Sequence, residues 1–115
     1  MRESTLWLLF LMAGILIIVT LTVHMGVMHL DGILGMEDVL SYDSTVARGR
    51  DIFYATVYTI LLGAALYHGL YGLRTILFEL SLRRGVERII SWAFLLFGIV
   101  TFVYGFWAIR MAYSL

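Results

Sequence analysis

Residues 66–80 read LYHGLYGLRTILFEL and place a histidine, an arginine and a glutamate inside an otherwise apolar segment. This segment ends a longer apolar stretch, residues 52–80, and two others cover residues 5–30 and 89–113. A helix needs about 20 apolar residues to cross a hydrocarbon core of roughly 30 Å, so each stretch is long enough. The sequence therefore predicts an all-α membrane protein with three transmembrane helices. We expect them to form one domain, residues 1–115, in which the third helix closes a thin bundle.

The composition supports a membrane protein and limits its chemistry. Of the 115 residues, 62% are hydrophobic and 14% charged, whereas a soluble domain has about 25% charged residues. The first apolar stretch is longer than the roughly 7–15 residues of a signal peptide, which predicts a retained helix. The chain has no cysteine, so it offers no thiolate to an iron–sulfur cluster and no attachment point for c-type haem. A redox centre held here would use histidine or methionine.

The charges are distributed unevenly between the two connections. Residues 31–51 hold five acidic residues against Arg48 and Arg50, and residues 81–88 hold three arginines against Glu87. Short cytoplasmic loops are rich in arginine and lysine, which predicts a cytoplasmic N-terminus and an acidic loop outside. Apolar residues recur at helical spacing in the outer loop, so we expect a short interfacial helix within residues 31–50. The residues that carry this spacing are Ile33, Met36, Val39 and Leu40.

Small and polar residues share one face of the predicted helix 52–80. They follow steps of three, four and seven, which a helix brings onto one side. A histidine there has the chemistry of an axial haem ligand, Gly72 leaves room for a porphyrin edge, and Arg74 has the charge to pair with a propionate. Small residues are also typical of plain helix–helix packing, and a histidine can simply bond across helices. The face consists of Ala64, Ala65, His68, Gly72, Thr75 and Glu79.

The pattern His68-x-x-x-Gly72-x-Arg74-x-x-x-x-Glu79 resembles the second-helix signature of the membrane anchor subunits of succinate dehydrogenase and fumarate reductase, the C and D subunits of complex II. The sequence departs from the signature at Glu79, where aspartate is usual, and at Thr75, where an aromatic residue or histidine is common. The aromatic stretch TFVYGFWAIR, residues 101–110, is similar to the last helix of the smaller anchor subunit. The resemblance implies that His68 is the axial ligand of a proximal haem b.

The acidic end of this pattern is less well matched. In the family this position lies near the cytoplasmic quinone pocket, beside a tyrosine that donates to the quinone, but here Leu80 follows Glu79. The resemblance makes Glu79 and Arg83 candidates for a quinone site. The alternative is an ion pair between them, because they are four residues apart in the favourable order.

Two more histidines, His24 and His29, lie near the far end of the first predicted helix. At about 1.5 Å per residue, His24 and His68 are separated by roughly 20 Å across the membrane. The two nitrogens that ligate one haem iron are only about 4 Å apart, so these histidines cannot share one haem. In family members with two haems the first helix serves the distal one, which implies His24 as its ligand and His29 as the alternative. Both histidines could instead be interfacial residues without a ligand.

We therefore expect a membrane anchor subunit of a succinate:quinone oxidoreductase that performs no succinate chemistry itself. The resemblance implies one or two b haems shared with a second anchor subunit, and menaquinone or ubiquinone as substrate. It also implies an iron–sulfur subunit and a flavoprotein subunit as partners, together with membrane lipid and no nucleic acid. The expected location is the plasma membrane of a prokaryote, crossed several times. The alternatives are a haem-free anchor of the same complex and a small structural packing or transporter subunit.

Overall fold

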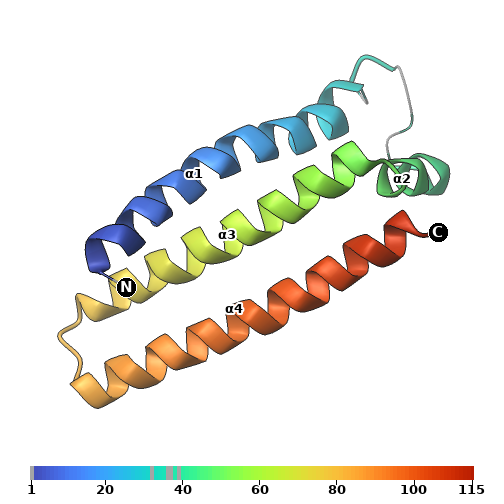
Figure 1. Ribbon diagram of the computed structural model, residues 1–115. Helices are drawn as coiled ribbons and strands as arrows, with labels where there is room; N and C mark the ends of the chain where they lie inside the picture. Colours follow the sequence, from blue (N-terminus) through green and yellow to red (C-terminus); the bar gives the residue numbers. More distant parts are fainter. Residues whose placement is uncertain (1, 32, 36–37, 39) are drawn as a thin grey trace.

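The computed structural model describes residues 2–31, 33–35, 38 and 40–115, and in these ranges it is helical with no strand (Figure 1). Three long helices are apolar enough to cross a membrane, which confirms the predicted all-α, three-span architecture. A five-residue π-helical segment extends the first of them, and one short helix lies in the long connection. The elements are α1 (Glu3–Gly26), η1 (Val27–Asp31), α2 (Tyr42–Gly49), α3 (Ile52–Phe78) and α4 (Arg84–Tyr113).

The three spanning helices form a row with α3 in the middle (Figure 1). Helix α3 runs antiparallel to both neighbours and packs against each, while in the described part of the chain no Cα atom of α1 lies within 8 Å of one in α4. The expectation that the third helix closes a bundle is therefore wrong. The start of α1 and the α3–α4 connection lie at the same end of the three long helices, which we call the first end. Helix α2 and the C-terminus lie at the opposite end, which we call the second end.

Local chemistry sets the helix boundaries. The side chain of Asp51 caps α3 by accepting from the backbone N–H of Phe53 at 2.8 Å, and Ser41 caps α2 by accepting from Ser44. Helix α3 ends at Phe78, two residues before the predicted end of the span. Ser81 has a φ of 56°, which turns the chain so that α4 begins at Arg84, five residues before the predicted span.

The connection between α1 and α3 contains a helix, as expected, but not at the residues that suggested it. Helix α2 covers Tyr42–Gly49, within the predicted range 31–50. Ile33 and Leu40 precede it, and Met36 and Val39 lie outside the described residues. The helix begins where the side chain of Ser41 supplies its N-terminal cap.

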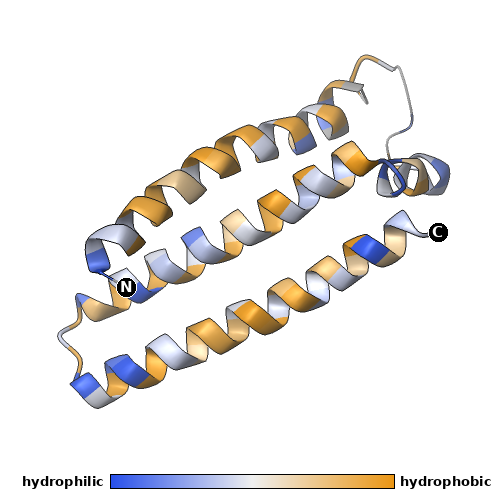
Figure 2. Ribbon diagram, in the orientation of Figure 1, coloured by the Kyte–Doolittle hydropathy of each residue, from blue (hydrophilic) through white to orange (hydrophobic). Residues whose placement is uncertain are grey.

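Small residues make the tight contacts between the spanning helices. The most buried side chains among the described residues are small: Thr20, 5% exposed, and Ala13 and Ala64, 7% exposed each. Large apolar side chains instead cover the outside, where lipid replaces water. Figure 2 shows this apolar cover as orange along most of α1 and α4, with paler and blue stretches within α3. The helix with two protein neighbours thus carries His68 and Arg74 within its apolar length.

Enlarging the small residue at the α3 interface should separate the helices. Ala64 lies one turn before His68 on the same face and is buried, whereas its neighbour Ala65 is exposed. We expect Ala64→Leu to lower the free energy of unfolding by about 1–3 kcal/mol through overpacking. Ala65→Leu, the matched control, should leave it nearly unchanged. Thermal unfolding of the protein in detergent measures both, and equal midpoints for the two variants would contradict this packing.

Candidate functional site

His68 lies in the contact between α3 and α1 and is held there by two interactions. Its Nδ1 is 3.0 Å from the carbonyl oxygen of Phe10, and its ring stacks on the Phe10 ring with centroids 4.1 Å apart and planes at 3°. A carbonyl oxygen only accepts, so Nδ1 carries the proton and donates it to this bond. The other ring nitrogen, Nε2, then has a lone pair and no hydrogen-bond partner in the described part of the chain.

Two glycines admit this arrangement. A Cβ on Gly14 of α1 would lie 3.2 Å from Cε1 of His68, and a Cβ on Gly72 would lie 3.1 Å from the Phe10 ring. Both contacts are tighter than ordinary van der Waals packing, so glycine lets the imidazole and the phenyl ring lie flat between the helices. The structure thus gives Gly72 a contact with Phe10. The predicted contact of Gly72 with a haem stays a prediction.

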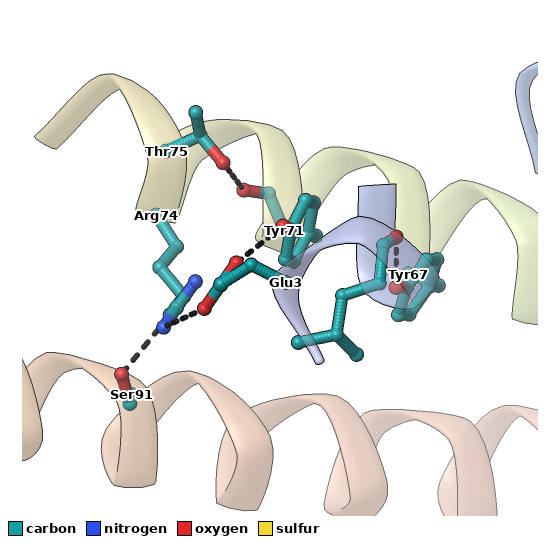
Figure 3. A network of polar contacts seen from close by, with 7 residues as sticks. Glu3, Tyr67, Tyr71, Arg74, Thr75 and Ser91 are labelled. Atoms are coloured by element: carbon teal, nitrogen blue, oxygen red, sulfur yellow. Dashed lines mark hydrogen bonds and ion pairs between the residues drawn. The ribbon is translucent and has the colours of Figure 1, made fainter. Parts of the chain in front are cut away.

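Arg74 connects all three spanning helices near the first end (Figure 3). Its Nε donates to the hydroxyl of Ser91 on α4 at 3.0 Å, and its Nη2 donates to Glu3 on α1 at 3.3 Å. The Tyr71 hydroxyl donates to the other carboxylate oxygen of Glu3 at 2.8 Å. One helical turn before Tyr71, the Tyr67 hydroxyl donates to the Leu6 carbonyl at 2.7 Å. A charge inside a membrane span is costly unless it is paired, and Arg74 has an ion pair with α1 and a hydrogen bond to α4.

Next to this network an apolar groove of about 510 Å³ runs along α3 and α4. Arg74 and Ser91 lie at one end of it, and Phe102 and Val103 lie at the other. Leu6 of α1 forms part of the wall. The groove is open because α1 and α4 do not meet over α3.

His24 lines a second pocket, at the end of the long helices where α2 and the C-terminus lie. This pocket of about 390 Å³ lies between α1, α2, α3 and α4, and its polar lining includes Thr45, Arg48 and Tyr58. The His24 ring meets Tyr58 edge-on, with centroids 5.2 Å apart. Its Nδ1 is buried and has no hydrogen-bond partner among the described residues, which is uncommon for a buried polar atom. His29, by contrast, is exposed within η1.

The contacts place the two histidines far apart along the axis of α1. His68 touches Phe10 and Gly14, and His24 lies 10–14 residues further along α1. At about 1.5 Å per residue this amounts to roughly 15–21 Å. The two side chains therefore belong to separate sites. No cluster of three or more histidine, cysteine, aspartate or glutamate side chains that could hold a metal ion occurs in the residues that the structure describes.

The two predicted quinone residues lie away from both pockets. Glu79 is the exposed C-cap of α3, and Arg83 is the exposed N-cap of α4. They form no ion pair, although both are described, because the helix ends before Glu79 and the two residues do not share a helical face. The alternative of a helical ion pair is therefore wrong, and the quinone role stays a prediction.

Sequence reasoning missed the partners of the polar residues. Phe10 and Gly14 looked like ordinary apolar positions, and nothing local marks them as neighbours of His68. Tyr67 and Tyr71 were detectable in part, because they flank the histidine and stack on each other with centroids 5.7 Å apart. Glu3 carried the clearest signal: it is an acidic residue at the predicted membrane edge on the same side as Arg74.

Three membrane-spanning helices with paired polar residues inside them define a small multi-pass membrane protein whose interior chemistry is concentrated on α3. The chain is 31% identical over 107 residues to the succinate dehydrogenase hydrophobic membrane anchor subunit of Archaeoglobus fulgidus, covering 90% of this chain and 85% of that protein. It belongs to the family of succinate dehydrogenase membrane anchor subunits, as the resemblance predicted. No family model matches the chain, and no solved structure matches it.

The bond to Phe10 fixes the tautomer of His68, which a spectroscopic measurement can check. We expect neutral His68 to carry its proton on Nδ1, because a carbonyl oxygen can accept only from a protonated nitrogen. Nitrogen-15 chemical shifts of labelled protein in detergent distinguish the two tautomers. His29, which is exposed, provides the internal reference for an unconstrained ring. A His68 protonated mainly on Nε2 would show that the bond does not form.

Proposed function

We propose that this chain is the hydrophobic membrane anchor of a succinate dehydrogenase and that it holds haem b through Nε2 of His68. Family membership supports the first part. The observation that carries the second is the bond from Nδ1 of His68 to the Phe10 carbonyl. Histidines that ligate metals almost always donate their other N–H to a carbonyl, a carboxylate or water, which orients the ring and makes the ligating nitrogen more basic.

Haem b supplies a centre that accepts and passes on single electrons. The residues of this chain would prepare its ligand. The Phe10 carbonyl holds the proton on Nδ1, and the parallel Phe10 ring limits rotation of the imidazole. Arg74 is proposed as the partner of a propionate. Its Nε and Nη2 donate to Ser91 and Glu3, while its Nη1 donors make no bond within the described residues and stay available.

His24 is the proposed ligand of a second, distal haem. Two observations support His24 over His29. The Nδ1 atom of His24 is buried without a hydrogen-bond partner among the described residues, and His24 lines the second pocket, whereas His29 is exposed. Because His24 and His68 belong to separate sites, each haem would need any further protein ligand from another chain. A second anchor subunit is the proposed source.

The remaining proposals concern the complex around the chain. An anchor subunit would associate with the iron–sulfur and flavoprotein subunits and contribute to electron transfer to menaquinone or ubiquinone. Glu79 and Arg83 remain the proposed quinone contacts, at the first end, which we expect to face the cytoplasm. The proposed location is a prokaryotic plasma membrane, crossed three times.

A haem-free anchor is the second candidate, and the same residues give it support. The Phe10 ring covers Gly72, and the contacts of His68 with Phe10 also serve as ordinary packing between α1 and α3. In that case the histidine would join two helices and ligate nothing. The content of b-type haem in the purified complex separates the two candidates.

Removing the proximal ligand should remove one haem. We expect the purified complex to absorb in the b-type α-band and His68→Ala to lose one haem per complex, because its axial nitrogen is gone. His68→Phe keeps a ring that can stack on Phe10, so it should lose the same haem while retaining more of the thermal stability. A wild-type complex without a b-type spectrum, or His68 variants with full haem content, would exclude haem ligation by His68.

The distal assignment needs its own variants. If the complex holds two haems, His24→Ala should lose one of them and keep the other, while His29→Ala, the matched control five residues away, should keep both. Haem per complex, measured as the pyridine haemochrome, gives the count. Loss in His29→Ala with retention in His24→Ala would transfer the role to His29.

A further inference from the structure

Two arginines of α4 lie beyond the Ser91 end of the apolar groove between α3 and α4. On α4, residues at alternating steps of four and three form one stripe that begins with two exposed arginines, passes Ser91 and continues as the groove wall. Its polar half is Arg84, Arg88 and Ser91, and its apolar half is Leu95, Gly98 and Phe102. The same helix face is therefore cationic at the membrane edge and apolar inside.

The charge at this end of the molecule favours an anion. The first end carries five arginines, namely Arg2, Arg74, Arg83, Arg84 and Arg88, against three glutamates, Glu3, Glu79 and Glu87. Arg74 and Glu3 form an ion pair with each other, which leaves four arginines against Glu79 and Glu87. Guanidinium groups bind phosphate oxygens through charge-assisted hydrogen bonds, which a neutral ligand cannot match.

The length of the groove corresponds to one membrane leaflet. From Arg74 to Gly63 on α3 is eleven residues, and from Ser91 to Val103 on α4 is twelve, which gives roughly 16–18 Å. Half of a hydrocarbon core of about 30 Å is roughly 15 Å. An acyl chain that entered beside Ser91 would therefore end near the bilayer midplane, at Phe102 and Val103.

We propose that this groove holds one acyl chain of an anionic phospholipid, whose phosphate is bound by Arg88 and Arg84. In this arrangement the side chains of Phe94, Leu95 and Ile99 contact the acyl chain, and the Ser91 hydroxyl lies where the ester groups of the lipid begin. A quinone would offer a similar apolar tail but no negative charge for the two arginines. The site does not depend on haem, so it can be tested whether or not His68 ligates iron.

Retention of defined lipids by the full-length chain, purified with the subunits that co-purify with it, tests the site. After delipidation the sample is mixed with detergent micelles that contain phosphatidylglycerol or phosphatidylcholine and examined by native mass spectrometry. We expect preferential retention of phosphatidylglycerol. Arg88→Gln should weaken it about fivefold, the effect of one basic residue near an anionic headgroup. Arg110→Gln, the same change at the other end of α4, should have no effect.

A groove-filling variant tests the apolar half. Leu95 lines the groove, while its neighbour Leu96 does not, and both are more than half exposed. Leu95→Trp should abolish retention of phosphatidylglycerol, and Leu96→Trp should preserve it. Because Arg88→Gln alters only an exposed charge, it keeps the test valid if Leu95→Trp fails to fold.

Three results would overturn the proposal. Equal retention of the two lipids by the wild-type protein would exclude recognition of the phosphate. A raised KM for quinone in Leu95→Trp with unchanged lipid retention would assign the groove to a quinone tail. Loss of another membrane subunit from Leu95→Trp, but not from Leu96→Trp, would assign it to a transmembrane helix of that subunit.

Discussion

The requirement that polar groups inside a bilayer find partners within the protein governs this structure. Helix α3 carries His68, Arg74, Tyr67 and Tyr71 into the membrane, and it is the helix with a neighbour on each side. From α1 it receives the Phe10 carbonyl, the Leu6 carbonyl and the Glu3 carboxylate, and from α4 the Ser91 hydroxyl. Threonine hydroxyls in the spans bond to the carbonyl four residues earlier, as at Thr20, Thr59 and Thr75.

The open row of helices follows from what each face contains. Small side chains and flat rings let α1 approach α3, while the flanks of α1 and α4 carry large apolar residues that lipid can solvate. A three-helix chain with few buried side chains gains little from closing on itself. The open side leaves a groove beside Arg74, and the far end leaves a pocket around His24, so the unit presents surfaces that a larger assembly or lipids can cover.

Much of the architecture was predictable because the hydrophobic length of a span is a property of the chain alone. The three spans were identified to within a few residues, and the errors arose at Ser81 and Arg84, where a left-handed residue and an uncapped helix start set the boundaries. The family was recognised from the spacing of His68, Gly72, Arg74 and Glu79, and the relative from Archaeoglobus fulgidus supports it. The order of the helices in space was not predictable, since length and hydropathy do not say which helix lies in the middle.

The sequence by itself determined that the chain has three spans and that His68 and Arg74 lie on the second, because both facts depend on composition along one dimension. The tertiary structure decided which groups meet those residues. The space beside Gly72 contains a phenylalanine ring, Arg74 is paired with a glutamate 71 residues away, and Nδ1 of His68 is fixed by a carbonyl on another helix. Such partners are distant in the chain and are brought together by helix packing, so no local pattern specifies them.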